Sequence, residues 1–343
     1  MEKRKLASIR VVSEINPILD ADAIERATVD GWNVVVKKGE FSPGDLCVYC
    51  EIDSLLPIRE EFEFLRKSSY RKMADGNEGF RLKTISLRKT TSQGLLLPIS
   101  ILPNEIISST GYADLPGTDV TQALGIVKYE PPMPASLAGK AKGFFPSFIP
   151  KTDEERIQNL PEIIENEKDT LFDATEKLDG SSSTYFIKNG EFGVCSRNLE
   201  LLEDEENSMW KFARQTDLET KMRSLERNIA LQGEIIGEGI QGNPYKMKGQ
   251  TVSFYNAFDI DKHEYLNYED FNNLIDMLGF QTVPVIHEGL KLPESIEGIL
   301  KLADGKSALN PNFNREGLVF RTRGSKRLSF KAISNLFLLG EKD

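Results

Sequence analysis

The sequence is poor in cysteine and has no long apolar segment. Three cysteines in 343 residues cannot form a disulfide framework, and such a composition is typical of a reducing cytoplasm. No apolar run approaches the roughly 20 residues that a membrane-spanning helix needs. The N-terminal Met-Glu-Lys-Arg-Lys is not followed by the apolar core of a secretory signal. We therefore expect a cytoplasmic protein without a membrane partner.

Histidine is scarcer still, which removes several kinds of catalytic centre. His263 and His287 are the only two in the sequence. The C-x-x-C pair Cys47 and Cys50 lies in a β-rich run, where positions i and i+3 point to opposite faces and cannot bind one ion together. Zinc-binding, thioredoxin-like and Ser-His-Asp chemistry therefore have no support in this chain.

The familiar phosphate-binding loops are also missing. No G-x-x-x-x-G-K-[ST] segment occurs. The segment from Gly237 to Gly242 fits G-x-G-x-x-G, but Asn-Pro244 follows at once and is a poor opening for the helix that a dinucleotide site needs. We reject both the P-loop and the dinucleotide-binding interpretation.

What is present is an ordinary globular composition with an uneven charge. Hydrophobic residues make up 39% and charged residues 28%, and the length corresponds to two or three domains. The net charge of −10 excludes a wholly basic nucleic-acid-coating protein. The first 140 residues are nearly neutral, with 18 Lys and Arg against 19 Asp and Glu. Their cations gather between residues 66 and 89, which indicates either a solvated surface or a phosphate-binding patch.

Short β-rich runs separated by turn residues fill the first ~100 residues. The expected strands are Ala7–Val12, Trp32–Val36, Leu46–Ile52, Phe80–Leu87 and Gly94–Ile99. Five such strands fit an OB-fold barrel, although a sandwich fragment or an SH3-like barrel would give nearly the same pattern. We expect an OB-like domain over residues 1–128.

Prolines and glycines dominate residues 129–150, which we interpret as a linker. Strands and helices without regular βαβ alternation follow in residues 151–343, which predicts an α+β domain. The expected helices are Lys151–Asn166, Asn207–Met222, Tyr268–Leu278 and Ile296–Leu302, and the expected strands are Thr170–Lys177, Thr184–Ile187, Gly193–Ser196, Ile229–Ile236, Thr251–Ile260, Gly317–Thr322 and Arg327–Lys331.

The segment Glu176-Lys177-Leu178-Asp179-Gly180 carries the strongest chemical signal. A lysine at a strand end can attack phosphorus once its amine is deprotonated, which burial or a neighbouring cation favours. An acid two residues later can hold a metal ion that neutralises the phosphate. Alone, such a segment is also common in surface turns.

Other segments follow the lysine in a specific order. They are Ser196-Arg197-Asn198, Gln232-Gly233-Glu234, Phe254-Tyr255-Asn-Ala-Phe258-Asp259-Ile260, Arg315-Glu316-Gly317-Leu-Val-Phe320-Arg321 and Leu328-Ser-Phe-Lys331-Ala-Ile-Ser334. Together they resemble motifs I, III, IV and V of the lysine-adenylating ligases and RNA-capping enzymes. In detail the sequence resembles the ATP-dependent RNA ligases with an N-terminal OB domain, the fifth RNA ligase family. The resemblance implies an α+β nucleotidyltransferase domain with ATP-grasp-like antiparallel sheets, preceded by an all-β OB-fold domain.

The resemblance also implies roles for individual residues. Lys177 would take AMP from ATP as a lysyl-phosphoramidate. Glu176 would border the adenine pocket and Phe258 would stack on the purine, although core packing is the alternative for this ring. Arg197 would hold a phosphate, and Glu234 the ribose hydroxyls.

Further roles concern charge. Asp179 and Glu316 would support Mg²⁺ or Mn²⁺. Lys331 would contact the AMP phosphate and help to deprotonate Lys177. Arg156 is a candidate for the ATP phosphates, with a surface arginine on a helix as the alternative.

One departure concerns motif V, which often reads K-x-K in this superfamily. Here Ser329 stands at the earlier position, so Lys331 is the remaining lysine. Lys326 or Arg327 could supply the second charge.

The implied reaction has three steps: formation of lysyl-AMP, transfer of AMP to a polynucleotide 5′-phosphate, and attack by a 3′-hydroxyl that seals the strand. We expect a monomer that acts on nicked duplexes with RNA on the 3′-hydroxyl side. Four residues of the basic stretch are the expected backbone contacts: Arg81, Lys83, Arg88 and Lys89.

Three alternatives stay open. One is a DNA ligase or a GTP-using capping enzyme, although these usually carry the OB domain behind the catalytic one. Another is a noncatalytic nucleic-acid-binding protein with a degenerate nucleotidyltransferase domain. The third is a scaffold whose OB barrel binds protein.

Overall fold

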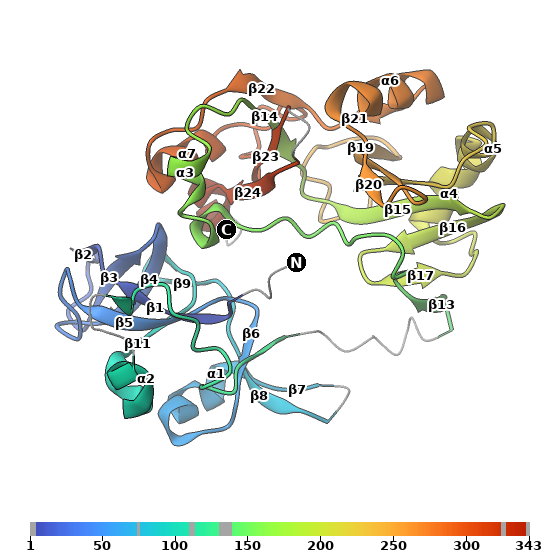
Figure 1. The fold of residues 1–343 in the computed structure, drawn as a ribbon. Helices are drawn as coiled ribbons and strands as arrows, with labels where there is room; N and C mark the ends of the chain where they lie inside the picture. Colours follow the sequence, from blue (N-terminus) through green and yellow to red (C-terminus); the bar gives the residue numbers. More distant parts are fainter. Residues whose placement is uncertain (1–4, 74–75, 110–113, 130–138, 324–326, 341–343) are drawn as a thin grey trace. The chain divides into compact units, whose positions relative to one another are not determined.

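The computed structural model describes residues 5–73, 76–109, 114–129, 139–323 and 327–340. The chain divides into two compact units, Met1–Met133 and Pro134–Asp343. We describe each unit by itself (Figure 1).

The first unit consists of short antiparallel strands. One sheet has the order β1 (Ala7–Val11), β5 (Leu46–Cys50), β11 (Leu95–Pro98), a second has β2 (Glu14–Pro17), β3 (Ile24–Val29), β4 (Trp32–Lys37), and a third has β12 (Val127–Lys128), β6 (Ser54–Leu56), β8 (Glu78–Arg81), β7 (Tyr70–Lys72). A hairpin joins β9 (Ile85–Leu87) to β10 (Thr90–Ser92). The helices are α1 (Arg66–Ser69) and α2 (Asn104–Ser109), with 3₁₀ turns at Glu60–Leu65 and Ile99–Ile101.

Strand β5 lies at the centre of this unit because both of its faces are buried. Val48 and Cys50 belong to one apolar cluster, and Cys47 and Tyr49 belong to another. The two cysteines therefore point to opposite sides, as strand geometry requires, and both are free thiols. Burial raises the pKa of each to about 12, so neither is a reactive thiolate.

Two details of the predicted strands differ. The expected run Phe80–Leu87 is interrupted, because Leu82 leaves the strand and its backbone N–H donates to Ser54 O (2.9 Å). Strands β2 and β3 were not predicted, since short polar sequences such as Glu14–Pro17 lack apolar alternation and find their pairing in β4.

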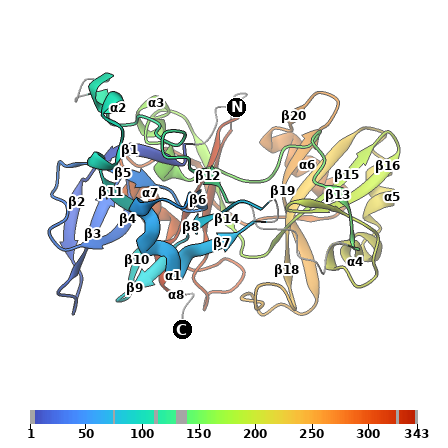
Figure 2. The ribbon, with the colours of Figure 1, turned by 90° about the horizontal axis from the view of Figure 1, so that it is seen from below.

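The second unit contains a large and a small sheet. The large sheet has the order β13 (Ala141–Phe144), β17 (Leu199–Leu201), β16 (Glu191–Ser196), β15 (Ser181–Lys188), β18 (Ile229–Gly237), β19 (Gln250–Asp259), β20 (Glu264–Tyr265), with β21 (Gln281–Thr282) parallel to β19. Helices α4 (Ser208–Gln215), α5 (Leu218–Arg223) and α6 (Tyr268–Leu278) pack on one face (Figures 1 and 2). Its other face is free of these helices and carries polar residues of β18 and β19.

The small sheet has the order β22 (Val285–Leu290), β14 (Phe172–Lys177), β23 (Gly317–Thr322), β24 (Ser329–Ile333). One face packs on α7 (Ile296–Ala303), α3 (Ile163–Asn166) and the 3₁₀ turn Ile157–Asn159 in a common apolar core. Helix α8 (Asn335–Gly340) follows β24. Since adjacent strand residues alternate in direction, the residues next to those of the core project from the opposite face.

Three predicted elements need correction. The expected helix Lys151–Asn166 is wrong: residues 151–155 are irregular, Pro161 interrupts the segment, and only Ile163–Asn166 is α-helical. The expected helix Asn207–Met222 is divided into α4 and α5, because Asp217 adopts a left-handed conformation (φ 55°). Within the expected linker 129–150, residues 130–138 lie outside the described part, and Ala141–Phe144 form strand β13, paired with β17.

Among the described residues, no helix combines the length and the apolar character needed to cross a bilayer.

Candidate active site

Lys177 occupies the last position of β14, where the small sheet approaches the large one. Its Nζ forms an ion pair with Glu316 Oε2 at 2.6 Å, and the side chains are 27% and 18% exposed. Gly180, just beyond, passes close to β18: a Cβ atom there would lie 2.4 Å from Ile235 O. The Asp-Gly pair after the lysine therefore lets the chain turn into β15 beside Glu234, which is opposite Ser182.

Three carboxylates surround Lys177 and hold its proton. Burial lowers the pKa of the lysine, but Glu316, Glu234 and Asp179 together outweigh burial and raise it above its ordinary value. The expectation that the pKa of Lys177 is depressed is wrong, because the charges of Glu316, Glu234 and Asp179 raise it more than burial lowers it. The amine must lose both its proton and its ion pair before it can act as a nucleophile.

Glu234, in contrast to Lys177, is favoured in its neutral form. Its pKa is raised to about 7, mainly by burial; Lys177 lowers it, while Glu316 and Asp179 raise it. Three acids near one lysine leave negative charge uncompensated, so this part of the site favours an additional cation.

Lys331 lies on β24, opposite Val319 of β23. Burial, together with the charges of Lys177 and Arg156, lowers its pKa to about 8, while Asp153 and Glu316 oppose the shift. Arg156 forms an isolated parallel bridge to Lys331. The structure thus brings the predicted cations Arg156 and Lys331 together, and Arg156 is not on a helix.

Glu176 points away from Lys177, as neighbouring strand residues do, and is 1% exposed. Its Oε2 accepts a hydrogen bond from the Ala308 backbone N–H (2.8 Å), whereas its Oε1 has no hydrogen-bond partner among the described residues. Burial raises the pKa of this carboxyl, while hydrogen bonds from the Ser307 side chain and the Ala308 backbone oppose the shift. An orphaned buried acceptor is costly, and it would accept readily from an amino group.

Residues 150–156, which we call the strap, contact both sheets. Its polar groups are hydrogen-bonded on the large sheet at one end and on the small sheet at the other. The contacts are Gln232 Nε2 to Pro150 O (2.8 Å), Thr152 Oγ1 with Ser182 Oγ (2.8 Å), Arg197 Nη2 to Asp153 Oδ1 (2.6 Å), Ser329 Oγ to Glu154 Oε2 (2.6 Å) and Lys331 N to Glu155 O (2.7 Å). The strap therefore places Asp153 on Arg197, which was expected to bind a phosphate, and Glu154 on Ser329 and Arg321.

Phe258 is placed in an apolar cluster rather than beside Lys177. Its ring is 2% exposed and packs edge-on against His263 (5.2 Å) and Tyr265 (5.1 Å). This position agrees with the core-packing alternative. Tyr255, which the sequence did not single out, lies nearer the site: its hydroxyl is 3.3 Å from Ser182 Oγ, and Glu234 contributes to raising its pKa.

Arg321 and Arg327 are further site residues that sequence reasoning missed or left open. Arg321 ends the segment that begins with Arg315 and is opposite Ser329 in the pairing of β23 with β24. The alternation of strand residues could have identified Arg321, because it places Arg321 on the same face as Val319. Only the strand register shows that Arg321 lies opposite Ser329. Lys326, the other candidate for the second motif V charge, lies outside the described residues.

Comparisons with known proteins agree with this arrangement. A family model described as an OB-fold domain matches residues 6–99, and one described as RNA ligase matches residues 171–333. A Naegleria gruberi RNA ligase structure with PPi is 46% identical, with 99% of this chain and 100% of that chain covered and a TM-score of 0.81. The chain belongs to the RNA ligase family.

Two further solved structures extend the comparison. One is a lysine-to-methionine mutant of the Naegleria gruberi RNA ligase with AMP and Mn, 45% identical, covering 99% of this chain and 100% of that chain with a TM-score of 0.82. Another is a glutamate-to-alanine mutant with ATP and Mn, 46% identical, with coverage of 99% and 100% and a TM-score of 0.81. A search of curated proteins found no match. The OB-fold and nucleotidyltransferase architecture expected from the sequence is confirmed for this RNA ligase family member.

The four basic residues expected to contact nucleic acid differ in their surroundings. Arg81 lies 3.6 Å from Asp53 and stacks over the Tyr129 ring (4.3 Å), so its charge has local partners. Lys83 is exposed in a loop. Arg88, which follows the expected strand Phe80–Leu87, forms with Lys89 the exposed two-residue turn between β9 and β10.

That turn has an unusual composition for its geometry. Arg88 and Lys89 have φ values of 49° and 60°. Two consecutive positive φ angles define the type I′ turn, which strongly favours Asn-Gly. Two long cations are thus held at a hairpin tip in a conformation that disfavours them, an arrangement often found at functional positions.

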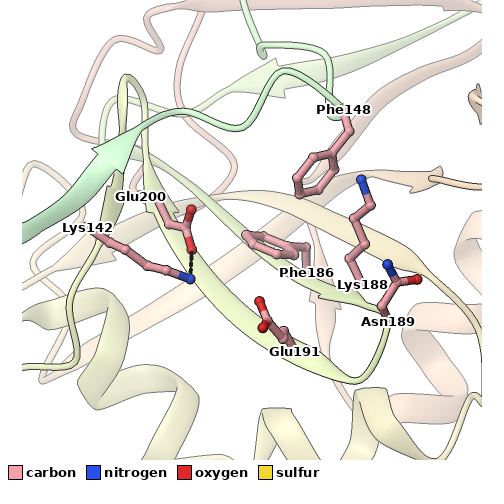
Figure 3. Close-up of a pocket in the computed structure, with 7 residues that line it drawn as sticks. All are labelled: Lys142, Phe148, Phe186, Lys188, Asn189, Glu191 and Glu200. Carbon is pink, nitrogen blue, oxygen red and sulfur yellow. Dashed lines mark hydrogen bonds and ion pairs between the residues drawn. The ribbon is translucent and has the colours of Figure 1, made fainter.

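A cavity of about 250 Å³ lies far along β15 from Lys177 (Figure 3). Its lining includes Phe148, Phe186 and Lys188, with Lys188 Nζ 3.6 Å from the Phe148 ring centroid. Lys142, also in the lining, pairs with Glu200 at 2.8 Å. None of the predicted site residues lines this cavity.

Proposed function

We propose that this chain is an ATP-dependent ligase that seals polynucleotide ends through a lysyl-AMP intermediate on Lys177. The observation that carries the proposal is the convergence at Lys177 of Glu316, Glu234 and Asp179 with the cation Lys331 nearby. Membership of the RNA ligase family supports it, as do Naegleria gruberi RNA ligase structures with ATP and Mn.

Adenine fits the orphaned acceptor of Glu176. The carboxylate Oε1 needs a hydrogen-bond donor, and the adenine 6-amino group is one, whereas guanine presents an acceptor oxygen at that position. This complementarity favours ATP over GTP and therefore argues against the capping-enzyme alternative.

A divalent cation fits the carboxylates around Lys177. The described residues contain no group of three or more His, Cys, Asp or Glu side chains that could hold a metal ion by themselves. Mg²⁺, however, is usually held by one or two carboxylates together with substrate phosphates and water. Glu316 and Asp179 would be these carboxylates. Bound there, the cation would neutralise the charges that keep a proton on Lys177 and would offset those of the phosphates.

The chemistry of the first step then follows from the positions of the side chains. The Lys177 Nζ proton, which Glu316 Oε2 holds at 2.6 Å, passes to water. The free amine attacks the α-phosphorus, the bond to the bridging oxygen breaks, pyrophosphate leaves with the electron pair, and the attacking nitrogen loses its second proton to water. Lys331 would face the α-phosphate, and Glu234 would accept from the ribose hydroxyls. Most of the catalysis is positioning and charge stabilisation.

For the later steps we propose transfer of AMP to a 5′-phosphate and attack by a 3′-hydroxyl, at nicks in which the 3′-hydroxyl strand is RNA. The OB-fold unit supports a nucleic-acid partner. The exposed cations at the hairpin tip, Arg88 and Lys89, fit a phosphate backbone.

A labelling experiment tests the proposed function. The protein is incubated with α-labelled ATP or GTP and Mg²⁺ or Mn²⁺, and acid-resistant label on the protein is measured. We expect label from ATP and none in Lys177→Ala, with Lys168→Ala, an exposed lysine, as the matched control. No label in the wild type, or label that survives Lys177→Ala, would reject the proposal. Label from GTP in place of ATP would favour a capping enzyme.

A second measurement addresses the substrate. Four nicked duplexes that differ only in RNA or DNA on each side of the nick are sealed under identical conditions. We expect the two with RNA at the 3′-hydroxyl to be sealed at least tenfold faster. Equal rates, or a preference for DNA there, would contradict the assignment and favour the DNA-ligase alternative.

A further inference from the structure

Arg321 shares a sheet face with the nucleophile. In the register of the small sheet, Lys177 is opposite Gly317, Val319 is opposite Lys331, and Arg321 is opposite Ser329. Directly opposite residues and those two apart along a strand project from the same face. Lys177, Lys331 and Arg321 therefore form a row of cations on the face that looks toward the large sheet.

The guanidinium of Arg321 is enclosed but poorly satisfied. Its side chain is 15% exposed. Nη1 donates to Thr175 Oγ1 at 3.2 Å and Nη2 to Glu154 Oε1 at 3.4 Å, while the buried Nε has no hydrogen-bond partner among the described residues. Of five N–H donors, two make bonds, one at the long end of the usual range and one beyond it. The group is placed as a donor for an acceptor not supplied by these residues.

A second arginine increases the positive charge at this point. Arg327 donates to Asn256 Oδ1 (2.9 Å) and lies over the Tyr265 ring, 3.9 Å from its centroid. Burial, and next the charge of Arg321, lower its pKa to about 10. The half-buried guanidinium of Arg321 and that of Arg327, an exposed residue, thus lie near each other, and Glu154 is an anion close to both.

Glu154 is itself divided between two partners. It accepts from Ser329 through Oε2 and from Arg321 through Oε1. One carboxylate for two arginines leaves an excess positive charge, which an incoming anion can neutralise.

Resting on the proposed function, we propose that Arg321, with Arg327 beside it, binds the pyrophosphate portion of the nucleoside triphosphate and takes the place of a lysine at position 329. The α-phosphate would lie between Lys177 and Lys331. The β- and γ-phosphates would extend along the row of cations to Arg321, which can bind two phosphate oxygens through its planar fork. When the bond between the α-phosphorus and the bridging oxygen breaks, the charge on the departing pyrophosphate develops beside both arginines.

The proposal predicts that Arg321 matters for one partial reaction alone. In Arg321→Ala we expect lysyl-AMP formation from ATP to fall roughly 10²–10³-fold, with weakened inhibition by pyrophosphate. Sealing of a chemically pre-adenylated nick, which releases AMP and involves no pyrophosphate, should stay within about twofold of the wild type. The matched control is Arg323→Ala, since Arg323 pairs with Asp173 (2.6 Å) and Glu288 (3.2 Å); it should leave both reactions unchanged.

A rescue variant tests the replacement itself. Ser329→Lys in the Arg321→Ala background restores a cation opposite the deleted one and should recover lysyl-AMP formation at least tenfold. Wild-type adenylation in Arg321→Ala, equal loss of both reactions, or no recovery by the added lysine would overturn the proposal. If Arg321→Ala does not fold, Arg321→Lys, which keeps the charge but loses the fork, should raise the KM for ATP about tenfold and spare pre-adenylated sealing; an unchanged KM would overturn it.

Binding of inorganic pyrophosphate separates this inference from the proposed function. Calorimetric titration should show pyrophosphate binding to the wild type and to Arg323→Ala, and at least tenfold weaker binding to Arg321→Ala. Weaker pyrophosphate binding by Arg321→Ala can be observed even if no lysyl-AMP forms. The proposed function would then be rejected, and the assignment of Arg321 would be retained. Equal binding to all three proteins contradicts the assignment of Arg321, whatever the labelling experiment shows.

Discussion

Ionised Glu234 should destabilise the folded protein near neutral pH. Its pKa is raised from 4.5 to about 7, chiefly by burial. The folded protein therefore holds the proton more tightly than the unfolded chain. The stability due to this proton is fully present below the unfolded pKa and is lost as the pH rises through about 7.

The magnitude follows from the shift. At about 1.36 kcal/mol per pKa unit, ionising Glu234 costs the folded protein at most about 3 kcal/mol, reached above pH 7, with the value reduced by solvent where the side chain is partly exposed. Glu234→Gln keeps the shape and removes the titration. Its advantage over the wild type should therefore grow by about 2 kcal/mol between pH 5 and pH 8, while its lysyl-AMP formation falls.

The measurement is urea unfolding of both proteins at the two pH values. Trp210 is buried in the second unit and Trp32 in the first, so a Trp32→Phe background lets the fluorescence of Trp210 report the unit that contains Glu234. Glu238→Gln, an exposed change just beyond β18, is the control and should show no such pH dependence. A stability difference between Glu234→Gln and wild type that is the same at pH 5 and pH 8 would refute the reasoning.

Three further predictions concern other groups. Glu176→Gln supplies an amide N–H beside the base, and the preference for ATP over GTP in kcat/KM should fall at least tenfold; an unchanged ratio would contradict the role of its Oε1. Glu316→Gln removes the carboxylate that most raises the pKa of Lys177, so NMR titration of the lysine should show a lower pKa, and an equal or higher value would be inconsistent with the ion pair. Replacing Arg88 and Lys89 by Asn and Gly should stabilise the first unit by roughly 1 kcal/mol while weakening nick binding and reducing its log–log salt slope by about two; tighter or unchanged binding would reject a role in backbone contact.

Much of the second unit could be predicted because its strands have strong local signals. The buried strands β14, β18 and β19 were predicted, and so was the position of Lys177 and Asp179 together at the end of β14. The segment 151–166 was misjudged because its acidic start resembles a helix cap. Its conformation is instead set by hydrogen bonds to distant residues such as Lys331, which no local pattern reports.

The site was predictable in its chemistry and less so in its geometry. Ordered motifs identified Lys177, Glu234 and Glu316, which the structure brings together. For Phe258 the sequence left two alternatives open, because an aromatic residue on a strand suits either a core or a base, and the structure places its ring in an apolar cluster with Ala230. Arg321 was overlooked because its significance depends on its position opposite Ser329, which is a matter of register.

If Arg197 and Arg321 bind phosphate as proposed, nucleotide binding must displace the carboxylates of the strap from these arginines. Asp153 and Glu154 already bind Arg197, Arg321 and Ser329. The charges of the two arginines are therefore partly neutralised before a phosphate binds. A single phosphate or sulfate ion gains little by displacing one carboxylate. A triphosphate displaces both at once with one molecule and gains the entropy of a chelate. The acidic strap should therefore weaken the binding of small anions such as phosphate more than the binding of a triphosphate.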